Sequence, residues 1–282
     1  MSAVVLTSAL PPRRRSWTLL VGLVLVSVVV ATALVSLVWL PFDPSDTSGT
    51  RLEGPSATHW LGTDKLGRDL ATQLMIGARI ALTVGLGSVA VGAVIGISVG
   101  LVAAFAASWL DDTISAALDV VIAFPVLLLA MLIVAAQGAS LGSVILAIGL
   151  AMSAIVARLT RVLTKRVLGE QFVTAARTSG TRWPGIVARH ILPNVWPTLS
   201  VNLALQFGVA VLAEASLSYL GLGAPPPNAS WGRLLQEAQG TVVTAPVGAI
   251  APGLALVALV IGVNFVADGL RDVADPSRRR NR

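Results

Sequence analysis

The strongest constraint on the fold of this chain is a set of long stretches that contain no charged residue. A helix needs about 20 apolar residues to cross ~30 Å of hydrocarbon, and each stretch is at least that long. Only 12% of the 282 residues are charged and 55% are hydrophobic, too little polar surface for a soluble protein of this size. We therefore expect a polytopic, all-α membrane protein. The charge-free stretches are residues 16–42, 80–110, 120–157, 191–213 and 238–267.

The expected topology has six transmembrane helices with both termini in the cytoplasm. Five of the 20 lysines and arginines then lie outside and the other 15 lie inside, as the positive-inside rule predicts. The spans are placed at residues 17–40, 80–107, 113–136, 140–160, 196–219 and 248–268. The basic residues expected outside are Arg51, Lys65, Arg68, Arg79 and Arg233.

This topology divides the chain into five parts. They are a cytoplasmic tail (1–16), a first transmembrane helix (17–40), an extracytoplasmic loop (41–79), a five-helix core (80–271) that includes a cytoplasmic loop (161–195), and a basic cytoplasmic tail (272–282). The first helix follows Arg13-Arg14-Arg15 and contains Ala31-Thr32-Ala33, features of an export signal. Its apolar run continues to Leu40, which favours a retained anchor.

Three glycines in the second span recur every four residues, so Gly92, Gly96 and Gly100 share one helix face and predict close helix packing. The same stretch matches the G-x-S-x-G pattern of serine hydrolases around Ser98. That motif requires a strand-to-helix elbow and a histidine partner. A charge-free helical run offers neither, and the sequence argues against a hydrolase.

Sequence signals for catalysis or cofactor binding are absent. The chain has no cysteine, no phosphate-binding loop before either lysine and no H-E-x-x-H motif. We expect no catalytic, cofactor-binding or metal-binding residue. Uphill transport would then use ATP hydrolysis by another chain, or an ion gradient coupled through buried carboxylates. The three candidates for ion coupling lie toward the ends of their spans, which disfavours that mechanism. They are Asp119, Glu214 and Asp268.

The cytoplasmic segment 170–194 predicts two short helices joined by a turn. Gly180 can end the first helix with a positive φ, and Pro184 can open the second. Residues at helical spacing give the second helix an apolar face. Physics alone leaves two interpretations open, namely a docking surface for a partner and an amphipathic helix at the lipid headgroups. The apolar face comprises Trp183, Ile186, Val187 and Ile191.

The pattern Ala175-Ala176-x3-Gly180 followed by His190-Ile191-Leu192-Pro193 resembles the EAA loop of binding-protein-dependent ABC importer permeases. That family usually has glutamate where this chain has Thr174. Three further segments resemble its dipeptide and oligopeptide branch, with the pattern of the C-type subunit, so that the resemblance spans residues 10–277. They are residues 59–69, residues 212–232, and residues 268–276.

The resemblance implies a type I ABC importer permease fold and a non-enzymatic translocation subunit in the bacterial cytoplasmic membrane. It implies import of dipeptides or short oligopeptides by alternating access. Nickel complexes, glutathione or haem are alternative solutes, and an ion-coupled transporter or a membrane sensor is less favoured. Its implied partners are a homologous permease, two ATPase domains that bind ATP and Mg, and an extracytoplasmic binding protein. The implied coupling residues are Thr174, Ala175, Ala176, Gly180, Ile191, Leu192 and Pro193.

The expected outer segments also have features of their own. Gly62, Gly67 and the charged cluster of Asp64, Arg68 and Asp69 predict a tight, hydrogen-bonded loop, either a structural plug or a contact for the binding protein. Pro225-Pro226-Pro227 predicts a stiff connection, and Trp231 is expected to anchor at the membrane surface. Four neutral polar residues are candidates for the solute path, whose lining is otherwise unknown. They are Gln137, Asn202, Gln206 and Asn264.

Overall fold

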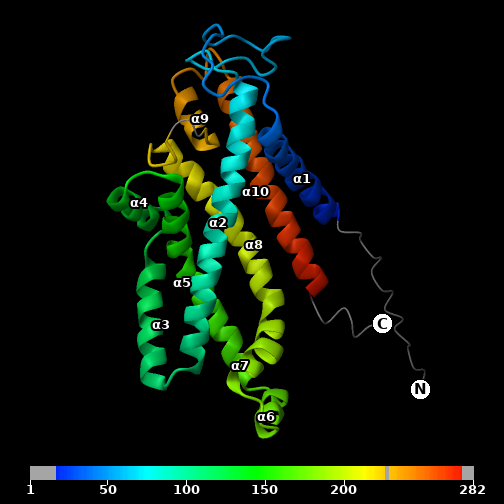
Figure 1. The fold of residues 1–282 in the computed structure, drawn as a ribbon, viewed down its shortest axis with the longest axis vertical. Helices are drawn as coiled ribbons and strands as arrows, with labels where there is room; N and C mark the ends of the chain where they lie inside the picture. The colour runs from blue at the N-terminus through cyan, green and yellow to red at the C-terminus, as the bar shows by residue number, and fades with distance from the viewer. Residues whose placement is uncertain (1–16, 226–228, 275–282) are drawn as a thin grey trace, which may run out of the picture.

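The computed structural model describes residues 17–225 and 229–274, and this part of the chain is helical without a β-strand. A single isolated bridge, between Thr63 and Asp69, is its only β-type pairing. The all-α prediction is therefore confirmed (Figure 1). The helices are α1 (Trp17–Val38), α2 (Leu70–Phe105), α3 (Ser108–Ala123), α4 (Val126–Gln137), α5 (Leu141–Leu168), α6 (Gln171–Thr178), α7 (Trp183–Ile186), the π-helical turn η1 (Val187–Ile191), α8 (Leu192–Tyr219), α9 (Trp231–Ala238) and α10 (Val247–Ala274).

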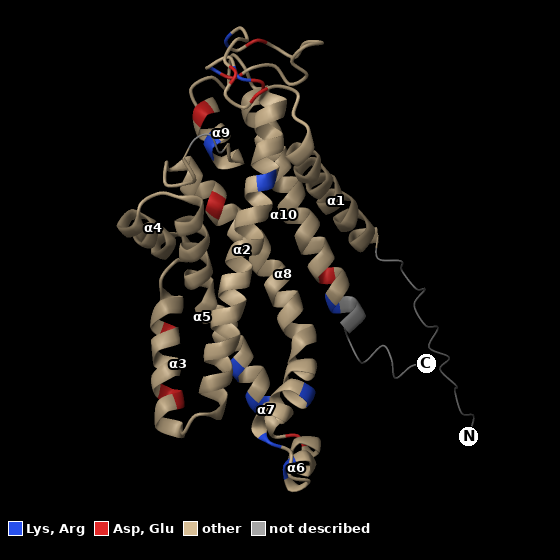
Figure 2. Ribbon diagram, in the orientation of Figure 1, with Lys and Arg blue, Asp and Glu red and all other residues tan. Residues whose placement is uncertain are grey.

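Five helical segments are long and apolar enough to cross a membrane, and α3 with α4 makes a sixth if the bent pair counts as one span. The segment Trp183–Tyr219 joins α7, η1 and α8 into one such span. We call the end of the bundle that carries residues 39–69 and α9 the loop end, and the opposite end the α6 end. Helix α1 rises to the loop end and α10 returns from it (Figure 1). Charged residues gather in the outer loops and around α6 and α7 (Figure 2).

The third predicted span, 113–136, is broken in the structure. Helix α3 ends at Ala123, α4 begins at Val126, and the two axes differ by 90°. Phe124 and Pro125 adopt extended backbone angles (ψ of 133° and 128°). Proline lacks an N–H and disfavours the helical conformation of the residue before it, so the helix ends at this dipeptide.

Helix α2 packs closely against α5 along the predicted glycine face. A Cβ atom added at Gly92 would lie 3.2 Å from the Gly149 carbonyl oxygen, and one at Gly96 would lie 2.6 Å from that of Ser153. At Gly100 the added Cβ would lie 2.4 Å from the Ala157 carbonyl oxygen. Close backbone approach therefore fixes the relative position of the two helices.

Helix α2 begins at Leu70, before the predicted start of the span at residue 80. Asp69 caps it, since its carboxylate accepts a hydrogen bond from the Thr72 N–H at 2.8 Å. Arg79, which we expected outside the span, lies within this helix and donates to the Ser36 carbonyl oxygen at 2.8 Å. Carbonyls in the last turn of a helix lack intrahelical donors, so Arg79 satisfies one at the end of α1.

Candidate functional site

Helix α6 lies at the tip of the α6 end, and Val173 is its buried residue. Val173 packs with Leu163, Val167 and Leu168 of α5. Ala176 is partly buried against the same cluster, whereas Thr174 and Ala175 are exposed. The helix therefore presents a small, sterically open surface away from the bundle.

The turn after α6 closes the helix through backbone hydrogen bonds. The Thr181 N–H donates to the Ala176 carbonyl at 3.0 Å, and the Gly180 N–H donates to that of Arg177 at 3.0 Å. This pair is the Schellman arrangement, which needs a left-handed residue at Gly180, whose φ is 82°. The predicted role of Gly180 in ending the first short helix is confirmed.

Two residues of the apolar face of the second short helix point into the bundle. Ile186 and Ile191 are fully buried and share a cluster with Val195 and Leu199 of α8. Helices α2 and α5 complete this cluster, which we call the junction cluster, through Ile97, Leu101, Leu159 and Leu163. Two of the four predicted face residues thus connect the turn to the bundle, and neither is exposed to a partner or to lipid.

Between α7 and α8 the helix widens into a π turn that the sequence reasoning missed. The Leu192 N–H donates to the carbonyl of Val187, five residues earlier. Pro193 has no N–H to offer the carbonyl one turn before it, and Pro197 repeats the defect inside α8. The Asn194 side chain donates to the His190 carbonyl at 2.6 Å within this turn. The two prolines, four residues apart, are the available sequence signal.

The implied coupling residues differ in how deeply they are buried. Thr174, Ala175, Gly180 and Pro193 are exposed at the α6 end, whereas Ile191 is buried in the junction cluster. The two remaining residues, Ala176 and Leu192, are partly buried against that cluster. The structure therefore provides an exposed helix that is directly connected to the packed interior.

Ion pairs join α3 to α5 near the α6 end. Asp111 accepts from Arg161 at 2.7 Å and also pairs with Lys165. Asp119, a candidate for ion coupling, pairs instead with Arg158 at 3.0 Å, and both side chains are more than half exposed. These ion pairs connect α3 to α5. The Asp119 side chain is not buried in the described part of the chain.

Glu214 is the buried carboxylate of α8, with 2% of its surface exposed. The Ser218 hydroxyl donates to it at 2.7 Å, and Ser230, the cap of α9, also bonds to it. Buried charged groups are stable only when they are hydrogen-bonded or paired. Glu214 therefore joins α8 to α9.

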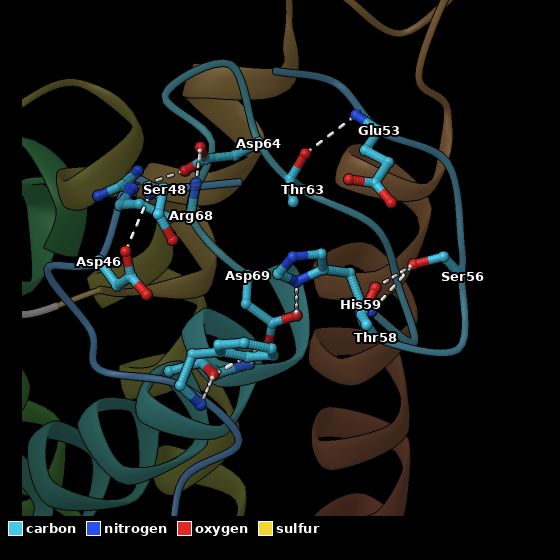
Figure 3. A network of polar contacts seen from close by, with 12 residues as sticks. Asp46, Ser48, Glu53, Ser56, Thr58, His59, Thr63, Asp64, Arg68 and Asp69 are labelled. Atoms are coloured by element: carbon cyan, nitrogen blue, oxygen red, sulfur yellow. Dashed lines mark hydrogen bonds and ion pairs between the residues drawn. The ribbon is translucent and has the colours of Figure 1, made fainter. Parts of the chain in front are cut away.

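The loop end is tied together by a polar network (Figure 3). Asp64 accepts from the Arg68 guanidinium at 2.6 Å. Arg68 also donates to Glu237 of α9 at 2.6 Å. His59 bonds through Nδ1 to the Asp69 carboxylate at 3.0 Å. The predicted tight loop is thus present, and it is ionically linked to α9.

Trp231 is not a membrane-surface anchor, contrary to expectation, because it is 2% exposed within the protein. Its indole N–H donates to the Leu74 carbonyl of α2 at 3.0 Å. The ring lies against Gly77, where an added Cβ would approach it to 2.3 Å, and Gly232 similarly abuts the Ala215 carbonyl. These contacts pack α9 between α2 and α8.

The predicted path residues occupy different environments. Gln137 is exposed at the end of α4, and Asn264 of α10 lies beside Gly208 of α8. Gln206 is 7% exposed, and within the described residues its Nε2 has no hydrogen-bond partner. The described residues also contain no cluster of three potential metal ligands.

Comparison with protein families gives a match over most of the chain. The family described as "Binding-protein-dependent transport system inner membrane component" matches residues 92–280. The matched region contains α6, the junction cluster and α9, but not α1.

Individual proteins resemble the chain over a longer range. The dipeptide transport system permease protein DppC of Alkalihalophilus pseudofirmus is 37% identical over 92% of this chain and 86% of that protein. The glutathione transport system permease protein GsiD of Pectobacterium atrosepticum is 41% identical over 79% of this chain and 74% of that protein. A solved structure of the MetNI methionine ABC transporter in inward-facing conformations has a similar fold. Its TM-score is 0.61, with 21% identity over 72% of this chain and 96% of that chain.

Proposed function

The chain belongs to the family of binding-protein-dependent transport system inner membrane components, and on this basis we propose that it imports dipeptides or short oligopeptides by alternating access. It acts as the membrane-spanning permease subunit of an ATP-driven importer. The α6 end faces the cytoplasm and the loop end faces outward. Both termini are cytoplasmic, in agreement with the charge bias of the sequence.

The exposed helix α6 carries this proposal. It has small residues on its open side, a closed C-terminal turn, and a buried anchor at Val173. The helix that follows its turn is continuous through the membrane from Trp183 to Tyr219. A push on α6 would therefore pass through the hydrogen-bonded turn at residues 179–182 into a helix that runs through the bundle.

The energy source lies in partner chains. The sequence contains no phosphate-binding loop, so two ATPase domains that bind ATP and Mg would bind below the permease pair and push its coupling helices. Helix α6 would be the coupling helix of this chain, through the surface around Ala175 and Ala176. A homologous permease would complete the path as a heterodimer, and an extracytoplasmic binding protein would deliver the solute to the loop end.

The peptide assignment rests on the relatives. One relative is named for dipeptides and another for glutathione, which is itself a short peptide. Neutral amides in the bundle suit peptide groups because each offers both a donor and an acceptor. Nickel complexes and haem are the alternative solutes of the same branch.

Crosslinking tests the docking of α6. The chain has no cysteine, so Ala176→Cys introduces a unique thiol, and co-expressed ATPase subunits with cysteines at their permease-facing surface serve as partners. We expect a crosslink whose yield changes with ATP. Ala57→Cys, exposed in the outer loop, is the matched control and should give none. Absence of the Ala176 crosslink in a correctly inserted protein would refute the docking site, and uptake of labelled dipeptide by the same cells tests the solute.

A further inference from the structure

Trp183 connects α6 to α2 at the α6 end. It is the first residue of α7, and its ring meets that of Phe105 edge to face, with centroids 5.0 Å apart and planes at 72°. The Arg177 guanidinium of α6 lies 4.7 Å from the ring centroid of Trp183. Each contact is of a type that contributes attraction beyond area burial. The indole thus bridges a residue of α6 and the last residue of α2.

Phe105 connects this contact to the bundle. It follows Ile97 and Leu101 at four-residue spacing, so the three side chains lie on one face of α2. Ile97 and Leu101 pack against the junction cluster. Helix α2 then continues without interruption to Leu70 at the loop end. A displacement of Trp183 can therefore act on α2 as well as on α8.

The ring contact can change without disruption of the core. Phe105 and Trp183 are 37% and 42% exposed, whereas Ile186 and Ile191 are fully buried. An open space of about 580 Å³, lined by Phe105, Trp183, Pro184 and Val187, lies beside the rings. This space lies at the surface and not in the closely packed interior, so the two rings have room to change their contact while the junction cluster stays packed.

We propose that Trp183 is a positioning residue that transmits the movement of α6 to α2, in parallel with the continuous helical connection to α8. This inference rests on the proposed function, since it requires ATPase subunits that move α6. Trp183 touches neither solute nor nucleotide in this role. It determines whether α2 follows α6.

The test uses the purified complex of this chain with its permease, ATPase and binding-protein partners in lipid vesicles. The measured quantity is the ratio of peptide transported to ATP hydrolysed, together with the ATP-sensitive crosslink of Ala176→Cys in each background. The variants are Trp183→Ala, Trp183→Phe and Phe105→Ala. Trp196→Ala, which removes a tryptophan that is 53% exposed on α8, is the matched control.

We expect Trp183→Ala and Phe105→Ala each to lower the ratio of peptide transported to ATP hydrolysed about fivefold. A change of this size in an equilibrium constant corresponds to the free energy of one edge-to-face aromatic contact. Trp183→Phe should retain most of the ratio, and the control and the crosslink yields should not change. The double variant Trp183→Ala/Phe105→Ala should fall no further than either single variant, because both remove the same contact.

Three results would overturn the inference. The first is an unchanged ratio in Trp183→Ala. The second is a fall in the yield of the Ala176→Cys crosslink in Trp183→Ala that is as large as the fall in the transport ratio, because Trp183 would then only maintain the fold of α6. The third is a multiplicative fall in the double variant. A missing crosslink in the protein that carries Ala176→Cys alone is distinct from all three, since it counts against the proposed function itself.

Discussion

Replacement of Gly96 by alanine should force α2 and α5 apart. The added Cβ would lie 2.6 Å from the Ser153 carbonyl oxygen and 2.6 Å from the Val156 Cβ. Both contacts are shorter than van der Waals separation, and neither atom belongs to the mobile end of a long side chain. The helices must therefore shift along their most closely packed interface.

The expected cost is the difference between two effects. Overpacking of a well-packed interior costs about 1–3 kcal/mol, whereas alanine favours a helix over glycine by about 0.8–1 kcal/mol. Gly96→Ala should thus destabilise the protein by up to about 2 kcal/mol. Gly253→Ala in α10, where an added Cβ has no neighbour within 4 Å, keeps only the helix effect and should stabilise by up to about 1 kcal/mol. Gly92→Ala, at 3.2 Å from the Gly149 carbonyl, should fall between them.

Thermal unfolding of the detergent-solubilised chain, followed by the fraction that stays monodisperse after heating, gives the order of the three variants. The expected order of Tm is Gly253→Ala above the native protein, then Gly92→Ala, and Gly96→Ala lowest. Equal Tm values for Gly96→Ala and Gly253→Ala would show that the glycines do not set the helix separation. The reasoning about close approach would then be wrong.

Three further predictions concern the loop end. Asp69→Ala removes the cap of α2 and should lower the free energy of unfolding by about 0.5–2 kcal/mol; an unchanged denaturation midpoint would contradict the cap assignment. Trp231→Phe replaces the indole by a smaller ring and removes the N–H that donates to the Leu74 carbonyl, at a cost of at least about 0.5–1.5 kcal/mol, to be measured in the same way, and no loss would mean that this bond is not formed. Arg68→Ala should raise amide hydrogen exchange in both residues 47–69 and α9, because Arg68 joins Asp64 to Glu237; faster exchange in the loop alone would rule out the ionic link.

The features that the sequence predicted well depend on residues close together in the chain. Charge-free runs locate the spans because any charge in hydrocarbon is costly, so a long apolar run is itself a signal that can be read without knowledge of the tertiary contacts. Gly180 and Pro184 predict a turn followed by a helix start. Each of these acts through the local backbone alone, and each lies where it was expected.

The features that it missed depend on residues far apart. The sequence around Trp231 predicts an interfacial tryptophan. In the structure, Gly77 of α2 provides the space for its ring inside the protein. Ile186 and Ile191 form an apolar face in either of the two interpretations of that helix, and only the position of α5 and α8 shows that the face is internal. The early start of α2 is different, because its cap, Asp69, directly precedes the helix and bonds to Thr72, a local signal that lies outside the charge-free run.

The broken third crossing has a consequence for how the chain is made. Helix α3 has 16 residues, about 24 Å at ~1.5 Å per residue, which is less than the ~30 Å of hydrocarbon. It also carries Asp111 and Asp119, whose basic partners Arg161, Lys165 and Arg158 all lie on α5. While the ribosome has yet to finish α5, α3 is both too short and too acidic to settle in the bilayer by itself. Its insertion should therefore wait for α5 to emerge from the translocon, so that the two enter the lipid as a pair.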